Sequence, residues 1–88
     1  MTVTFYGRIT EYTGGDKTFT PEKGAFLTLR GLLDGLGRHY GEGFEAFING
    51  NETCLILLNG NGAALAGGMD PPLKEGDKVD ILPFVDAG

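Results

Sequence analysis

One stripe of apolar residues with helical spacing constrains the fold more than any other feature of the sequence. The stripe lies between residues 28 and 41 and recurs at i, i+3, i+4, i+7 and i+11, with the residues Leu29, Leu32, Leu33, Leu36 and Tyr40. This spacing places the five side chains on one face of an amphipathic helix. Thr28 is a suitable N-cap residue, and Gly41 is suited to the position after the last turn. The pattern therefore predicts a helix over residues 29–40.

The same segment contains three glycines, which lower its intrinsic helix propensity: Gly31, Gly35 and Gly37. Each costs up to about 1 kcal/mol relative to alanine in a helix interior. We still predict a helix, because packing of an apolar face usually stabilises a helix in a protein more than propensity does.

The segment before this helix has the pattern of a β-hairpin. Val3 and Phe5 alternate with threonines, which is the two-residue period of a half-buried strand. We expect residues 8–12 to continue this strand up to a turn at residues 14–16. Residues 17–20 then form a short returning strand that ends before Pro21.

The segment after the helix predicts one short helical turn and three further strands. The turn lies within residues 43–50, and the apolar run 54–58 is consistent with a strand buried on both sides. Asn59-Gly60 is a strong hairpin signal, and residues 63–68 are expected to form a short edge strand and loop. After a turn at residues 74–77, a last strand runs from Lys78 to Pro83, with its apolar residues and Phe84 directed inward.

This order of elements, β-β-α-turn-β-β-β, predicts an α+β fold of the β-grasp (ubiquitin-like) type. Such a fold has a mixed sheet, here of four to five strands, with one main helix across one face. A chain of 88 residues is long enough for only one core. We expect one β-grasp domain over residues 1–84 and a flexible C-terminal tail over residues 85–88.

Charge and composition argue against several classes of partner. The net charge is −5, and the seven basic residues are scattered among twelve acidic ones, whereas nucleic-acid binding depends on clustered Lys and Arg. No apolar stretch approaches the roughly 20 residues that span a bilayer, and the first residues lack the pattern of a signal peptide. The single cysteine, Cys54, fits a reducing compartment. We therefore expect a cytoplasmic protein with no nucleic-acid or membrane partner.

The side chains offer no constellation for an active site or a metal site. His39 is the only histidine and Cys54 the only thiol, so a zinc site of clustered Cys and His ligands is not expected. Gly60-Asn61-Gly62 is not followed by the Lys-Ser or Lys-Thr pair of a phosphate-binding loop. We predict no cofactor bound by this chain.

The C-terminal residue, Gly88, is the remaining candidate for chemistry. An α-carboxylate has a pKa of about 3.5, so at neutral pH it is ionised and unreactive as an acyl donor. It becomes reactive only when another protein activates it. A glycine at this position lets the carboxylate enter a narrow tunnel, because there is no Cβ to obstruct it.

The last fifth of the chain makes the role of Gly88 more specific. It reads PLKEGDKV from Pro72 to Val79, then ILPFVDAG from Ile81 to Gly88. This stretch resembles the C-terminal signature of the MoaD/ThiS family of sulfur carriers. In that family a Pro-Leu-x-x-Gly-Asp-x-Val segment leads through an apolar strand and a proline to a Gly-Gly end. The first strand, the start of the helix and the Leu58-Asn59-Gly60 hairpin are also similar, and the molybdopterin synthase small subunit is the nearest branch.

The resemblance implies a function that depends on partner proteins. An E1-like adenylating enzyme would activate Gly88 with its own ATP and magnesium, and a sulfur donor would convert the adenylate to a thiocarboxylate. The large subunit of molybdopterin synthase, or an equivalent acceptor, would take the sulfur. The residues implied in the tail and in docking to the partner are Phe84, Val85, Asp86 and Ala87.

One residue departs from the family pattern, and two other functions stay open. Ala87 stands where the family has a glycine, and its methyl group narrows the accessible backbone conformations in a tail fitted to glycine. The first alternative is a non-catalytic β-grasp interaction module that does not use its terminus. The second is a ubiquitin-like modifier that is conjugated through Gly88.

Overall fold

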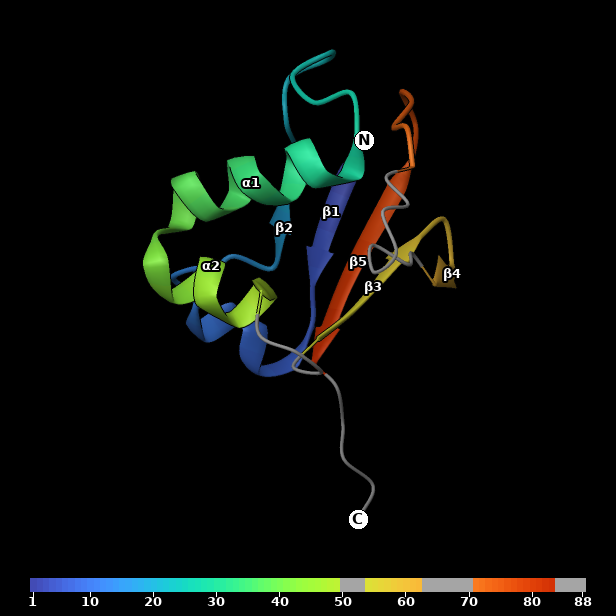
Figure 1. The fold of residues 1–88 in the computed structure, drawn as a ribbon. Helices are drawn as coiled ribbons and strands as arrows, with labels where there is room; N and C mark the ends of the chain where they lie inside the picture. The colour runs from blue at the N-terminus through green and yellow to red at the C-terminus, as the bar shows by residue number, and fades with distance from the viewer. Residues whose placement is uncertain (50–53, 63–70, 84–88) are drawn as a thin grey trace.

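Figure 1 shows the fold in a computed structural model, which describes residues 1–49, 54–62 and 71–83. Its elements in chain order are β1 (Thr2–Phe5), the 3-10 helix η1 (Gly7–Glu11), β2 (Thr18–Phe19), α1 (Leu29–Tyr40), α2 (Glu42–Asn49), β3 (Cys54–Leu58), β4 (Asn61–Gly62) and β5 (Lys78–Pro83).

The five strands form one mixed sheet in the order β2-β1-β5-β3-β4. The pairing of β1 with β5 is parallel, and the other three pairings are antiparallel. In Figure 1 the helix α1 crosses the sheet near β1 and β2. The predicted α+β fold, a mixed sheet with one main helix across one face, is confirmed.

The core lies between α1 and the central strands. Alternate residues of β1 and β5, including Val3 and Ile81, are fully buried, as the two-residue period predicts. The four leucines of the α1 stripe are buried against them. Thr28 caps the helix as predicted, because its Oγ1 accepts a hydrogen bond of 3.1 Å from the Gly31 N–H. At the other end, Gly41 has a φ of 100° and ends α1.

Two of the glycines in α1 lie where neighbouring side chains approach the helix closely. A Cβ built on Gly35 would overlap the ring of Phe26, which packs against the core from the loop before α1. A Cβ on Gly37 would lie 3.3 Å from Glu45 of α2. These contacts explain why glycines stand at positions 35 and 37, although glycine lowers helix propensity. Without a side chain, each glycine lets Phe26 or α2 pack directly on the backbone of α1.

The prediction that the first strand continues through residues 8–12 is wrong. Gly7 has a φ of 60°, and the chain turns there into η1. Ile9 of this helix is fully buried, so the turn contributes an apolar side chain to the core. The predicted helical turn within residues 43–50 is a longer element, the eight-residue α2.

The turn after β3 and the turn before β5 match their sequence signals. Asn59 and Gly60 both have positive φ, 53° and 83°, and join β3 to β4. The strand at the sheet edge beside β3 is β4. We expected an edge strand within residues 63–68, which lie outside the described residues. In the turn before β5, the Asp77 carboxylate accepts hydrogen bonds from Asn59 Nδ2 (3.0 Å) and the Lys74 N–H (2.7 Å). The Asn59 bond is the main cause of a lowered pKa for Asp77.

The contact between Gly35 and Phe26 gives the first prediction. Gly35→Ala should lower the free energy of unfolding by about 1 kcal/mol, because the new methyl displaces the Phe26 ring from the core. In a Phe26→Ala background the same substitution should instead stabilise by up to about 1 kcal/mol, since only the gain in helix propensity is left. Urea unfolding of the four proteins measures both effects. An equal effect of Gly35→Ala in the two backgrounds would contradict this explanation of the glycine.

Candidate functional site

β5 carries the chain to its C-terminal tail, and it is the central strand of the sheet. It pairs with β1 on one side and with β3 on the other. Val79 and Ile81 are fully buried in it. Because strands on both sides and the core beneath hold β5, the position of its last residue, Pro83, is fixed relative to the sheet.

The predicted site residues follow directly after this strand: Phe84, Val85, Asp86, Ala87 and Gly88. They lie outside the described residues. The boundary between domain and tail at residues 84 and 85 therefore stays a prediction, and so do the roles of the five residues. What the structure supplies is the end of the strand from which they continue.

The outer face of the sheet, opposite α1, carries an apolar patch close to the end of β5. Leu55 of β3 lies opposite Leu82 of β5, and Leu57 lies opposite Asp80. Leu55 is 42 % exposed, whereas the adjacent Ile56 points to the core. The prediction that residues 54–58 are buried on both sides is therefore wrong. We call Leu55, Leu57 and Leu82 the outer patch.

Tyr6 adds an aromatic ring near this patch. It follows β1 directly, and its hydroxyl donates a 3.2 Å hydrogen bond to Asp80 of β5. Burial, followed by the hydrogen bond and the negative charge of Asp80, raises the pKa of Tyr6 above its usual value. The phenol therefore stays protonated at neutral pH and offers a ring that is 41 % exposed. The sequence signal for this face was the leucine at position 82, which falls out of phase with Val79 and Ile81.

Cys54 lies beside the end of β5 but has the environment of a packing residue. It is opposite Pro83 in the register of β3 and β5, and it packs half-buried against the core. Burial raises the pKa of its thiol. A protonated thiol is a poor nucleophile, which favours a packing role for this residue over a reactive one.

The other side chains considered for chemistry are possible metal ligands and the single histidine, His39. Within residues 1–49, 54–62 and 71–83, no group of three His, Cys, Asp or Glu side chains could hold a metal ion. The His39 ring instead contacts the rings of Phe19 and Tyr40, with centroids 5.2 and 4.6 Å away. No helix in the described part of the chain is long and apolar enough to cross a membrane.

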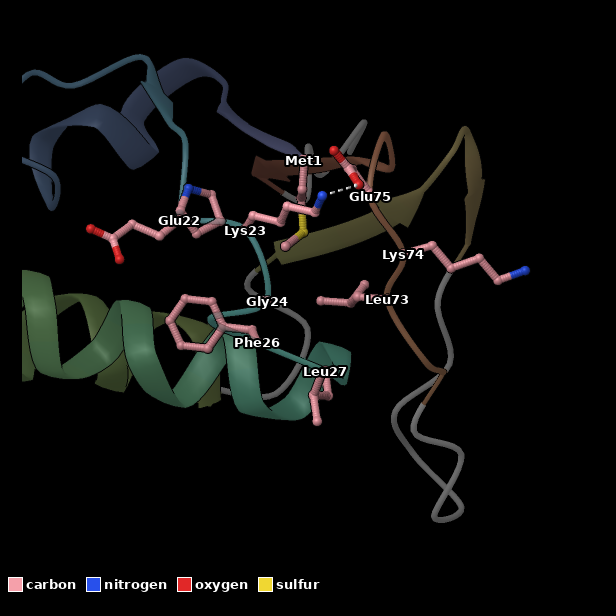
Figure 2. Close-up of a pocket in the computed structure, with 10 residues that line it drawn as sticks. Met1, Glu22, Lys23, Gly24, Phe26, Leu27, Leu73, Lys74 and Glu75 are labelled. Carbon is pink, nitrogen blue, oxygen red and sulfur yellow. Dashed lines mark ion pairs between the residues drawn. The ribbon is translucent and has the colours of Figure 1, made fainter.

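A cavity of about 350 Å³ lies at the other end of the sheet, between residues 21–27 and 73–75 (Figure 2). Its apolar side chains include Phe26 and Leu73, and an ion pair of 3.3 Å between Lys23 and Glu75 spans it. Glu75 precedes β5, a strand of six residues, and each residue of a strand advances about 3.3 Å. The cavity is therefore separated from Pro83 by most of the length of the sheet.

Comparison with known proteins identifies the family. A model described as the ThiS family matches residues 3–88, which is nearly the whole chain. The chain belongs to the ThiS family. No curated protein sequence matches the chain. The family assignment confirms the resemblance to ubiquitin-like sulfur carriers that the last strand and its flanking residues indicated.

Three solved structures share the fold of this ThiS-family chain. The complex of BexX and CysO from Amycolatopsis orientalis contains a chain with a TM-score of 0.75 and 21 % identity, with 99 % of this chain and 98 % of that chain covered. CysO of Mycobacterium tuberculosis has a TM-score of 0.74 and 24 % identity, with 96 % and 98 % covered. SAMP1 of Haloferax volcanii has a TM-score of 0.66 and 20 % identity, with 99 % and 97 % covered. The β-grasp fold is therefore confirmed.

The environment of Cys54 gives the second prediction. Cys54→Ala should lower the free energy of unfolding by about 1 kcal/mol, because it removes a half-buried sulfur from the edge of the core. It should leave unchanged the sulfur chemistry that the family resemblance assigns to Gly88. Denaturant unfolding and a thiocarboxylate assay on the purified variant measure the two properties. A folded Cys54→Ala protein that no longer carries sulfur would show that the thiol takes part in the chemistry.

Proposed function

We propose that this ThiS-family protein is a sulfur carrier that holds sulfur as a thiocarboxylate on Gly88. The observation that carries the proposal is the family match, which extends through residue 88. The fold supports it, because the central strand of the sheet carries the chain directly into the segment that ends at Gly88. The described side chains offer no competing reactive centre near this strand.

The proposed chemistry has two steps. In the first, a carboxylate oxygen of Gly88 attacks the α-phosphorus of ATP, pyrophosphate leaves, and an acyl adenylate forms. In the second, a donor sulfur at the oxidation level of sulfide attacks the carbonyl carbon, and AMP leaves with the electron pair of the broken C–O bond. The adenylate is needed because an ionised carboxylate is a poor acyl donor. The magnesium and the groups that stabilise charge in these steps belong to the activating enzyme.

An E1-like adenylating enzyme is the partner that this chemistry requires. We propose that it contacts the outer patch while the tail enters its nucleotide site. Gly88 is five residues from Pro83, and five extended residues reach at most about 18 Å, so the docking surface has to lie near the end of β5. Leu55 and Leu82 meet that requirement. The solved complex of BexX with CysO supports the idea that a carrier of this fold binds a partner protein.

The acceptor we propose is the pterin precursor of the molybdenum or tungsten cofactor, held in a large subunit equivalent to that of molybdopterin synthase. The support for this acceptor is the sequence resemblance of residues 72–88 to the small subunit of that enzyme. The lone Cys54 thiol supports a reducing compartment, the cytoplasm, as the place of the reaction.

Removing the terminal glycine tests the proposal. Deletion of Gly88 should abolish ATP–pyrophosphate exchange with a purified activating enzyme, because the carboxylate would then lie one residue short and misplacement by about 1 Å can cost about 100-fold in rate. The melting temperature should stay unchanged, since residue 88 lies beyond the last strand. Ala87→Gly is the matched control, and it should retain or increase the exchange rate. Equal exchange from wild type and the Gly88 deletion would refute the proposed role of the terminus.

The outer patch gives a separate prediction. Leu55→Ser should weaken binding to the activating enzyme by about 1–3 kcal/mol, which is the usual range for an apolar interface anchor. Leu27→Ser is the matched control, because Leu27 is 73 % exposed and lines the cavity at the other end of the sheet. Titration calorimetry of the folded variants measures both affinities. If the two substitutions have the same effect, docking does not use the outer patch.

A further inference from the structure

The parallel pairing between β1 and β5 stops at a proline. Its last hydrogen bond runs from the Tyr6 N–H to the Ile81 carbonyl, at 3.0 Å. In the register that pairs Phe5 with Ile81, the next bond of a parallel ladder would run from the nitrogen of residue 83 to the Tyr6 carbonyl. Residue 83 is proline, which has no N–H. The ladder therefore lacks its next hydrogen bond at this residue.

The segment that follows β1 turns away from β5 at the same level of the sheet. The Tyr6 carbonyl accepts a hydrogen bond of 3.3 Å from the Ile9 N–H in the first turn of η1, so it is satisfied without β5. Gly7 turns the chain with its φ of 60°. A Cβ on Gly7 would lie 3.0 Å from Cγ of Pro83, which shows that the proline ring occupies the space beside this turn.

The pairing on the other side of β5 does not need the missing N–H. Pro83 lies opposite Cys54, the first residue of β3. Successive residues of a central strand direct their backbone groups alternately to the two neighbouring strands, and residues 81 and 83 direct theirs toward β1. The proline therefore ends the pairing with β1 and leaves the pairing with β3 intact.

We propose that Pro83 and Gly7 are positioning residues that end the pairing of β5 with β1 at one defined residue and so keep the tail available to a partner on that side. This inference rests on the proposed function of Gly88. Each tail residue drawn into the sheet would shorten the reach of the carboxylate by about 3.3 Å. This displacement is about three times larger than the misplacement of about 1 Å that can cost about 100-fold in rate.

Restoring the missing donor tests the inference. Pro83→Ala supplies an N–H to a Tyr6 carbonyl that has a second lone pair free to accept it. In the purified full-length variant, we expect the new amide at position 83 to be protected from hydrogen exchange. We also expect kcat for ATP–pyrophosphate exchange to fall about ten-fold or more, with KM unchanged, because the docking surface is untouched. Pro21→Ala, at the other end of the sheet, should leave kcat unchanged.

A variant with a longer tail shows whether Pro83→Ala lowers kcat through the position of the carboxylate or through a general effect on the structure. One glycine inserted between Val85 and Asp86 should restore kcat in the Pro83→Ala protein, since it returns the lost reach. The inference is overturned if the new amide at position 83 exchanges as freely as in an unfolded chain, or if Pro83→Ala retains wild-type kcat. If wild type itself shows no exchange with activating enzymes, the proposed function fails, and the protection of the amide in the Pro83→Ala protein still decides whether Pro83 ends the pairing.

Discussion

The parallel pairing of β1 with β5 is the constraint on which the rest of the structure depends. It joins the two ends of the chain at the centre of the sheet, and it places buried residues such as Phe5 and Ile81 side by side beneath α1. Burial of apolar surface is the main stabilising term in folding, and here it holds the strand that leads to the terminus. The end of β5 is therefore held by strands on both sides.

The two faces of the sheet have separate tasks. The inner face is covered by α1 and forms the core, whereas the outer face exposes Leu55 beside the end of β5. A contiguous exposed apolar patch is a common feature of interaction surfaces, and Leu55 lies next to Leu57 and Leu82 on this face. Under the proposed function, the tail is presented in a fixed relation to this surface, and a partner protein supplies the catalytic groups.

Much of the fold could be predicted from local patterns. The leucine stripe of α1, the Asn59-Gly60 turn and the turn before β5 all have signals within a few neighbouring residues, and the structure confirms each of them. The turn at Gly7 could not be read in this way, because the alternating pattern of β1 continues through that residue. The strand ends where Gly7 takes a φ of 60° and Ile9 turns into the core, with the ring of Pro83, near the opposite end of the sequence, beside this turn.

The chemistry assigned to the candidate site stays a prediction, and the surroundings of the site were predicted only in part. Gly88 was identified because the other side chains offer no reactive cluster and because the last residues resemble a known signature. The exposed side of β3 was missed, since a continuous apolar run does not show which residues face a partner. The glycines of α1 were likewise read as a weakness, whereas the contact of Gly35 with Phe26 depends on a loop whose course the sequence does not specify.

The most direct measurement is the intact mass of the protein isolated from its native cells, with and without treatment by an alkylating probe that reacts with thiocarboxylates. A sulfur carrier predicts a fraction heavier by the difference between one sulfur and one oxygen, with the label located on Gly88 by fragmentation. The Cys54→Ala protein should show the same label. Protein whose Gly88 carries an unmodified carboxylate under every growth condition, or whose terminus is found joined to lysines of other proteins without a thiocarboxylate form, would contradict the proposed function.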